Sequence, residues 1–182
     1  CLEDRYDRYF YTITCTFQKN TLPLQSLVEC LMSKVESKED MYALITGASS
    51  GCGFEYARIM AQKGYKLLIV SNEEAIHDKA LLLRQDFGVE VVSLVRNLGV
   101  QDAAKELYDY CKQANIEVEV LINNAGVYHD RDFLDDSEAF NQLIFNLHMH
   151  TPAMLMYYFG QEMVKRSKGY ILNMCSITAD IA

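Results

Sequence analysis

A short apolar run in the first half of the chain leads directly into three closely spaced glycines. Residues 43–46 read Ala-Leu-Ile-Thr, and Gly47, Gly51 and Gly53 follow before a helical pattern begins at Phe54. A turn that binds a diphosphate must bring backbone N–H groups close to the anion, so its side chains must be small. The following helix must also point its N-terminus at the anion. The order strand, glycine turn and helix therefore predicts a phosphate site, with an ordinary glycine-containing turn as the alternative.

Polar or small residues also follow each of five predicted strands. In an open parallel sheet, ligands bind beyond the carboxyl ends of the strands, so a site there requires such residues. Five strand ends that agree are harder to obtain by chance than one motif. The residues that follow the strands are Thr46-Gly47, Ser71-Asn72, Arg96-Asn97, Asn123-Asn124-Ala125-Gly126 and Cys175-Ser176.

Alternating strands and helices must position these residues. The strands are continuous apolar runs, which is typical of strands that are covered on both faces. Short connections and βαβ alternation predict an α/β fold with a doubly wound parallel sheet, Rossmann-like and incomplete on its C-terminal side. The predicted strands are 42–46, 66–70, 89–95, 118–122 and 170–175, and the predicted helices are 52–63, 73–86, 100–114 and 136–167.

Residues 1–40 form a separate N-terminal extension of unknown role, and residues 41–182 form the partial nucleotide-binding domain. Residues 9–17 alternate between apolar and polar types, which predicts a strand. Residues 24–35 carry apolar side chains at helical spacing. This strand and helix are too small to fold alone. An extension or the remnant of an upstream domain is the main interpretation, and a role in binding a substrate or partner is the alternative.

Composition and charge narrow the function classes. The chain has 182 residues, is 50% hydrophobic and carries a formal net charge of -8, which argues against a nucleic-acid surface. No apolar run approaches the roughly 18 to 20 residues that cross a bilayer, and no secretory signal pattern is present at the N-terminus. We therefore expect a cytoplasmic protein that binds neither nucleic acid nor membrane.

The cysteines and histidines do not predict a metal site. The six cysteines are scattered without a Cys-x-x-Cys pair, and a reducing compartment would keep them as free thiols. His148 and His150 are two residues apart, so on a helix they would point about 200° apart around the axis.

Four motifs in order resemble the short-chain dehydrogenase/reductase family. They are Thr-Gly-x-x-x-Gly-x-Gly at 46–53, Asn-Asn-Ala-Gly at 123–126, Asn146, and Gly-x-Ile-x-Asn-x-x-Ser at 169–176. The resemblance covers residues 41 to 182. It implies hydride transfer between a nicotinamide cofactor and a small alcohol or carbonyl substrate.

The resemblance also implies which residues bind the cofactor. Three groups of residues would line the diphosphate turn, contact the adenine, and pass beside the nicotinamide ribose. In that order the groups are Gly47, Ser49, Ser50, Gly51 and Gly53; Asn97 and Leu98; and Asn124, Ala125 and Gly126.

The choice between NAD and NADP stays open. An Asp that ends the second strand of this domain would favour NAD and an Arg would favour NADP. Asn72 stands there and does neither, while Glu73 and Glu74 add negative charge that disfavours a 2′-phosphate. Either cofactor is therefore expected.

Two residues match catalytic positions of the family. Asn146 would interrupt the long helix and help hold a water in the proton relay, and Pro152 is consistent with a broken helix there. Ser176 would hydrogen-bond the substrate oxygen.

The family's Tyr-x-x-x-Lys pair would follow Ser176, but no such pair lies between it and Ala182. We therefore expect a C-terminally truncated chain that is inactive alone. The alternatives are a non-catalytic dinucleotide-binding module and an inactive fragment that does not fold stably.

The resemblance also implies a homodimer or homotetramer. In the family, the helix that carries Asn146 packs against its counterpart in a second subunit. Residues 155–159 read Leu-Met-Tyr-Tyr-Phe, which is apolar enough for such an interface. Simple core packing is the alternative.

Overall fold

The computed structural model of the chain describes residues 12–15, 40–128 and 133–175. Within these residues six strands form one sheet in the order β1-β6-β5-β2-β3-β4, and every pairing is parallel. The strands are β1 (Thr12–Cys15), β2 (Tyr42–Thr46), β3 (Lys66–Ser71), β4 (Val91–Val95), β5 (Val118–Asn123) and β6 (Tyr170–Met174).

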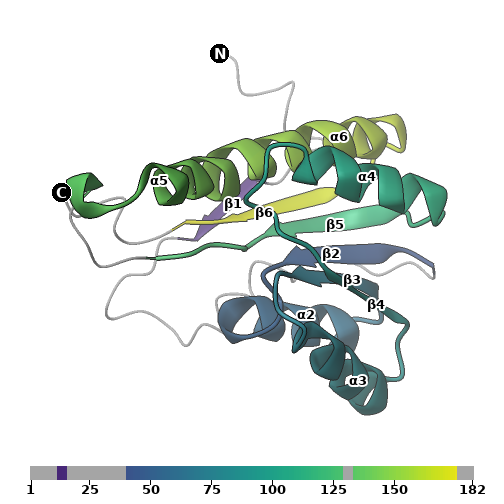
Figure 1. The fold of residues 1–182 in the computed structure, drawn as a ribbon. Coiled ribbons are helices and arrows are strands. Elements are labelled where there is room, and N and C mark those ends of the chain that lie inside the picture. Colours follow the sequence, from purple (N-terminus) through teal and green to yellow (C-terminus); the bar gives the residue numbers. More distant parts are fainter. Residues whose placement is uncertain (1–11, 16–39, 129–132, 176–182) are drawn as a thin grey trace.

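Helices cover both faces of this sheet, as Figure 1 shows. One face carries α2 (Gly51–Gln62) and α3 (Ile76–Phe87), and the other carries α4 (Ala103–Gln113), α5 (Glu138–Phe145) and α6 (Thr151–Lys165). The predicted doubly wound parallel sheet is therefore confirmed.

The centre of the sheet is mostly apolar because it is buried on both faces. All five residues of β2 are buried, and alternate side chains enter two different core clusters. Ala43 and Ile45 pack toward α2, whereas Leu44 packs on the side of α4 and α6. This arrangement explains why the strand reads as a continuous apolar run rather than as an alternating one.

The order of the strands places a switch point beside β2. From β2 the chain moves outward through β3 to β4, and it then returns to the other side of β2 with β5 and continues to β6. The connections on the two sides of β2 therefore run over opposite faces, which opens a crevice at the carboxyl ends of β2 and β5.

The predicted start of the helix over 73–86 is wrong by three residues. The helix α3 begins at Ile76, because the carbonyls of Glu73 and Glu74 accept turn hydrogen bonds from Ile76 and His77 (3.1 Å each). Its predicted end is confirmed: Gly88 caps the helix with φ +67° and donates to the carbonyl of Arg84.

The long helical region predicted over 136–167 consists of separate pieces. A short 3-10 helix, η1 (Phe133–Asp135), precedes α5, and a π-helical turn, η2 (Asn146–His150), separates α5 from α6. Pro152 lies in the first turn of α6 and has no N–H to donate to the carbonyl four residues earlier. The N–H of Thr151 instead donates to the carbonyl of Asn146, five residues back. The helix is therefore interrupted at Asn146, as expected.

The N-terminal strand is part of the main sheet. β1 pairs with β6 in the register Thr12↔Ile171 to Cys15↔Met174. The sequence pattern predicted a strand over 9–17 but did not predict its neighbour. The helix expected over 24–35 lies outside the described residues. Among the helices that are described, none has both the length and the apolar character needed to cross a bilayer.

Candidate functional site

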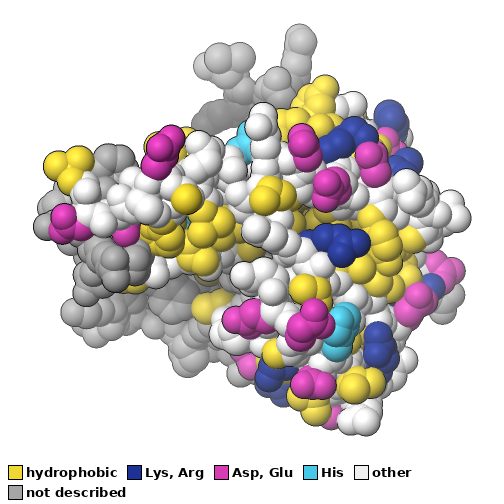
Figure 2. All heavy atoms as spheres, in the orientation of Figure 1, with side chains coloured by type: hydrophobic (Ala, Val, Ile, Leu, Met, Phe, Trp, Pro, Cys, Tyr) yellow, Lys and Arg dark blue, Asp and Glu magenta, His cyan; other side chains and the backbone are white. Residues whose placement is uncertain are grey.

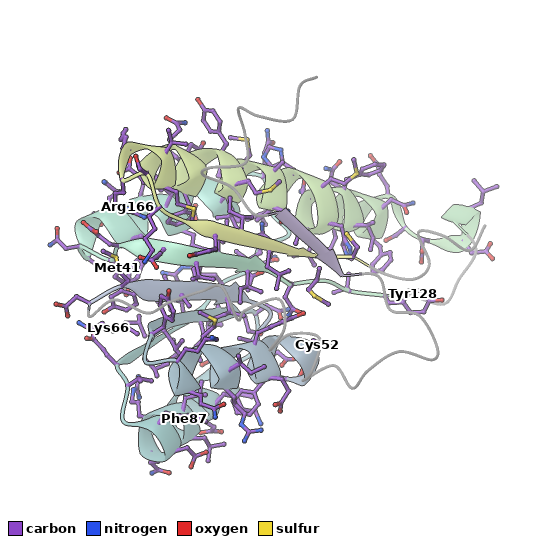
Figure 3. All side chains as sticks on the ribbon, turned by 180° about the vertical axis from the view of Figure 1, so that it is seen from behind. Met41, Cys52, Lys66, Phe87, Tyr128 and Arg166 are labelled. Atoms are coloured by element: carbon purple, nitrogen blue, oxygen red, sulfur yellow. The ribbon has the colours of Figure 1, made fainter. Side chains whose placement is uncertain are left out.

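A cleft of about 450 Å³ lies at the carboxyl ends of the strands. Segments that follow β2, β3, β4 and β5 line it, together with Leu143 of α5 and Leu147 of η2. Figure 3 shows Cys52 and Tyr128 at this end of the sheet, and Met41, Lys66 and Arg166 at the opposite end. Figure 2 shows hydrophobic side chains gathered between the two helix layers on one face, with acidic and basic side chains interspersed over the helices.

The cleft collects most of the residues that the sequence predicted for a cofactor site. The exceptions are Gly51 and Gly53, which belong to the first turn of α2 and do not line the cleft. The predicted catalytic residue Asn146 does not line it either. The predicted residues that line it are Gly47, Ser49, Ser50, Asn72, Asn97, Leu98, Asn124, Ala125 and Gly126.

Two of the three glycines are required by contacts between loops. Gly47 has φ +69°, and a Cβ atom on it would lie 2.7 Å from Cα of Ala125. A Cβ atom on Gly53 would lie 2.2 Å from the carbonyl oxygen of Gly47. Gly51 has φ +54° but faces open space. The glycines at 47 and 53 therefore let the turn after β2 pack against itself and against the turn after β5.

Thr46 joins these two turns, and sequence reasoning gave it no role beyond a polar strand end. Its Oγ1 accepts hydrogen bonds from the backbone N–H groups of Asn124 (2.9 Å) and Ala125 (3.0 Å). The same hydroxyl donates to the carbonyl of Ile122 (3.3 Å). Its place in the Thr-Gly pair at the strand end was the signal that could have identified it.

Asn124 connects the same two turns through its side chain. Its Nδ2 donates to the carbonyls of Thr46 (3.0 Å) and Gly47 (3.2 Å). The side chain of Asn124 therefore holds the glycine turn in place, and the two turns form one hydrogen-bonded unit at the switch point.

The cleft has a polar floor beside β3. Ser49 and Ser71 are buried, and the hydroxyl of Ser71 donates to Oγ of Ser49 (3.0 Å) while accepting from the N–H of Glu73 (3.2 Å). Asn72 is exposed at this end. The charged side chains among the described lining residues are Glu73 and Arg96, one of each sign.

The turn after β4 is fixed by its own side chain. Oδ1 of Asn97 accepts from the N–H of Gly99 (2.9 Å), which closes an Asx turn. Leu98 is buried and packs in the core cluster beneath α4 and α6. The amide Nδ2 of Asn97 and the exposed edge of this turn are therefore what the segment can offer a ligand.

Residues of the π-helical turn η2 and of the start of α6 bind the loop that follows β4. Nδ2 of Asn146 donates to the carbonyl of Gly99 (2.8 Å), and Oγ1 of Thr151 donates to the carbonyl of Leu98 (2.8 Å). Oδ1 of Asn146 accepts from Nε2 of Gln142 (3.1 Å). Because both ends of its amide are engaged in this way, the side chain of Asn146 anchors the loop, and its expected role in a proton relay stays a prediction.

The strand ends at β5 and β6 contain a partly buried amide pair. Nδ2 of Asn123 donates to Oδ1 of Asn173 (2.8 Å), and Nδ2 of Asn173 lies 3.2 Å from the sulfur of Met156. Oδ1 of Asn123 is buried and has no hydrogen-bond partner among the described residues. Cys175 follows β6 and is exposed, while Ser176, the predicted substrate-binding serine, lies outside the described residues.

One Tyr-x-x-x-Lys spacing occurs within the described residues, but it is remote from the cleft. Tyr108 and Lys112 lie on α4, and both contact the carboxylate of Glu162 on α6 (3.2 and 3.4 Å). Neither lines the cleft. This pair connects two helices.

Known proteins resemble the chain over the part that builds this cleft. A family model described as short chain dehydrogenase matches residues 41–182. The 2-dehydro-3-deoxy-D-gluconate 5-dehydrogenase of Bacillus subtilis (strain 168) is 27% identical over 138 residues, which are 74% of this chain and 52% of that protein. The very-long-chain 3-oxoacyl-CoA reductase of Homo sapiens is 29% identical over 142 residues, which are 74% of this chain and 44% of that protein.

A solved structure is similar to this chain in both fold and sequence. The short-chain dehydrogenase from Sphingobium yanoikuyae in complex with NADPH superposes with a TM-score of 0.72 at 26% identity, over 77% of this chain and 55% of that one. The chain spans about half the length of the curated relatives it matches.

Proposed function

Because the chain belongs to the short chain dehydrogenase family, we propose that it is the dinucleotide-binding part of an NAD(P)-dependent oxidoreductase. The observation that carries the proposal is the cleft, in which the segments after four parallel strands meet at the N-terminus of α2. A related structure holds NADPH. The substrate that we propose is a small alcohol or carbonyl compound.

The residues present fit such a cofactor. Backbone N–H groups in the first turn of α2 have no partner within the helix, so they and the helix dipole suit a diphosphate beside Ser49 and Ser50. No residue in the first turn of α2 is acidic. The Asx turn at Asn97 would lie at the adenine, and the turn 124–126 would lie at the nicotinamide ribose. Leu143 and Leu147 supply an apolar wall to the cleft.

When bound, a nicotinamide cofactor supplies or accepts the hydride. We propose that Ser176 orients the substrate oxygen and that Asn146 helps hold a proton-relay water. A positioned general acid contributes about 10² to 10⁴ in rate, and residues 177–182 contain neither Tyr nor Lys. Cofactor binding is therefore the activity that we propose for residues 41–182, and turnover requires a positioned general acid in addition.

Titration with NADH and NADPH tests the proposal. We expect saturable binding, seen as energy transfer from the protein's tyrosines to the reduced nicotinamide, and a rise in the thermal midpoint that increases with cofactor concentration. A folded chain that binds neither cofactor contradicts the proposal. Binding without turnover, after the sequence that relatives carry beyond this region is added, favours the non-catalytic module instead.

The choice between the two cofactors can be tested at Asn72. Replacement by Asp places a carboxylate where ribose hydroxyls would lie and where a 2′-phosphate would be repelled. We expect N72D to weaken NADPH binding by at least tenfold and to leave NADH binding within about threefold. N72R should act in the opposite direction. Equal effects of both variants on both cofactors would show that the adenosine does not bind beside Asn72.

We also propose that a second copy of the chain packs on the outer face of α5, η2 and α6. Large apolar side chains are exposed along this face: Phe145 (54%), Met149 (63%), Tyr157 (60%) and Val164 (49%). Sedimentation of the wild type and of Y157R tests this. A dimer or tetramer that Y157R converts to monomers supports the proposal, and a wild type that is monomeric at high concentration contradicts it. We also propose that the protein lies in the cytosol, where the free thiols of Cys52, Cys111 and Cys175 would persist.

A further inference from the structure

His148 lies in the π-helical turn η2 and reaches the turn after β5. Its Nε2 is 3.1 Å from the backbone nitrogen of Val127. A backbone N–H can only donate, so Nε2 accepts this hydrogen bond and carries no proton. The neutral imidazole with its proton on Nδ1 is thus the form that fits this contact.

The imidazole also lies directly against Gly126. A Cβ atom on Gly126 would lie 3.1 Å from Cε1 of His148 and 3.6 Å from its Nε2. That distance is closer than an ordinary van der Waals contact, so a side chain at 126 would push the ring away. The sequence suggested that Gly126 is small to let a cofactor approach, and the structure gives a second reason, which is the ring of His148 behind the turn.

The other polar residues of the same turn contact the loop that follows β4. Asn146 donates to the carbonyl of Gly99, and Nε2 of His150 lies 3.1 Å from the carbonyl of Gln101. A carbonyl can only accept, so His150 must carry its proton on Nε2. Two histidines two residues apart therefore use opposite tautomers, and they contact the loops after β5 and β4, respectively.

We infer that His148 is a positioning residue for the nicotinamide end of the cleft. The inference rests on the proposed function. His148 fixes the Asn124–Val127 segment by accepting one hydrogen bond and by ring contact with Gly126. Thr46 and Asn124 fix the start of that segment, and His148 fixes its end. Tyr128, the next residue, is 80% exposed, so the contact at Val127 is the last one that ties the described part of this loop to the fold.

The test compares an intact dinucleotide with a fragment that lacks the nicotinamide riboside. His148→Leu keeps the bulk of the ring but cannot accept a hydrogen bond, whereas His148→Gln restores an acceptor oxygen. We expect H148L to weaken NADPH or NADH binding by about 3- to 10-fold, the range expected for one hydrogen bond. Binding of ADP, which does not reach Gly126 in the proposed pose, should stay within twofold of wild type. H148Q should recover most of the lost affinity.

His150→Leu is the matched control, because it removes a histidine from the same turn without touching Val127. It should not lower dinucleotide affinity relative to ADP affinity. An H148L variant that lowers both affinities equally, or neither, overturns the inference, as does a failure of H148Q to recover affinity. If H148L does not fold, H148A is judged by the same comparison. A wild-type chain that binds no dinucleotide is a different result, because it contradicts the proposed function itself.

Discussion

Gly53 illustrates how a binding motif is also a packing motif. Its α-carbon faces the carbonyl of Gly47 and the amide of Asn124, both of which belong to the turns that line the cleft. The absence of a side chain at 53 therefore matters before any ligand binds, because it lets three backbone segments meet. Gly51 differs, because it faces open space and is distinguished by its positive φ alone.

The two glycines should respond differently to substitution. Gly53→Ala would place a methyl group 2.2 Å from the carbonyl oxygen of Gly47, so we expect a loss of about 1 to 3 kcal/mol in the free energy of unfolding. Gly51→Asn should cost less than about 1 kcal/mol, because Asn tolerates the left-handed region. Urea unfolding of both variants measures this, and equal losses would contradict the packing role of Gly53.

Cys111 should be an unreactive thiol. It lies on the buried face of α4, and burial raises its pKa to about 12. Since the thiolate is the reacting species, we expect iodoacetamide at pH 8 to modify Cys175, which is exposed, and to leave Cys111 unmodified until urea is added. Peptide mapping by mass spectrometry gives the answer. Modification of both residues at the same rate in the native protein would contradict the prediction.

At the scale of the elements, the sequence predicted what depends on local pattern. Strand β2 was predicted at its observed bounds because the apolar residues 42–45 lead into a Thr-Gly turn. The end of α3 was predicted because a glycine follows it, and Gly88 adopts the left-handed conformation that glycine favours. The start of α3 was not, because turn hydrogen bonds from the carbonyls of Glu73 and Glu74 delay the helix and leave no apolar signal.

The candidate site was predictable to the same degree. Residues that follow strands could be placed at one edge, since parallel strands share that edge. What those side chains bind was not predictable, because Asn97 and Asn124 direct their oxygen or amide to neighbouring backbone. The contact of His148 with Val127 joins residues 21 apart through a π-helical turn, and periodicity cannot show such a turn.

A buried carboxylate lies near the amino ends of the strands, opposite the cleft. Glu119 is 2% exposed, and its Oε1 accepts from the hydroxyl of Tyr65 (2.9 Å) and lies 2.8 Å from Nζ of Lys168. E119A removes both the acceptor and the opposite charge, so we expect a loss of about 3 kcal/mol in stability. Cofactor affinity should not change, because this contact is at the amino end of β5.

The control for that prediction is an exposed ion pair. Lys105 and Asp109 form an i,i+4 pair on the surface of α4, so K105A should cost no more than about 0.5 kcal/mol. Chemical denaturation and NADPH titration of both variants provide the two readouts. An E119A variant as stable as K105A would show that Glu119 is hydrated in solution.

Tyr42 makes the stability of β2 sensitive to alkali. Its hydroxyl donates to Glu90 (2.7 Å), and burial together with this carboxylate raises the pKa of Tyr42 from 10.0 to about 12. The folded state therefore holds the phenol proton more tightly than the unfolded state does. This contribution is complete below pH 10 and is lost as the pH rises toward 12.

The difference between wild type and Y42F isolates the effect. Both proteins contain other titrating tyrosines, which cancel when the free energies of unfolding are subtracted at each pH. We expect the wild type to be more stable than Y42F at pH 9 and the difference to shrink between pH 10 and 12. A difference that is constant over this range would contradict the raised pKa.

At the scale of the whole molecule, the N-terminal segment adds a strand to one edge of the sheet. β4 and β1 are the two edge strands, and β1 covers the outer edge of β6. Without β1, the backbone N–H and C=O groups of Tyr170–Met174 on that side would lack strand partners. Such an edge promotes pairing with another chain. The segment thus contributes to the sheet although it lies outside residues 41–182 of the family match.

Proline substitutions in β1 test this contribution within the complete chain. In a parallel pair, only every second residue of an edge strand directs its N–H to its neighbour, and proline has no N–H to donate. One of I13P and T14P should therefore lower the thermal midpoint and increase light scattering more than the other, while I13V should behave as wild type. NADPH affinity should stay within about threefold in all three, because the cleft is built from the segments after β2 to β5. Identical behaviour of both proline variants and wild type would mean that β6 does not depend on β1 for its outer partner, and loss of cofactor binding in parallel with scattering would mean that the sheet edge and the cleft are one cooperative unit.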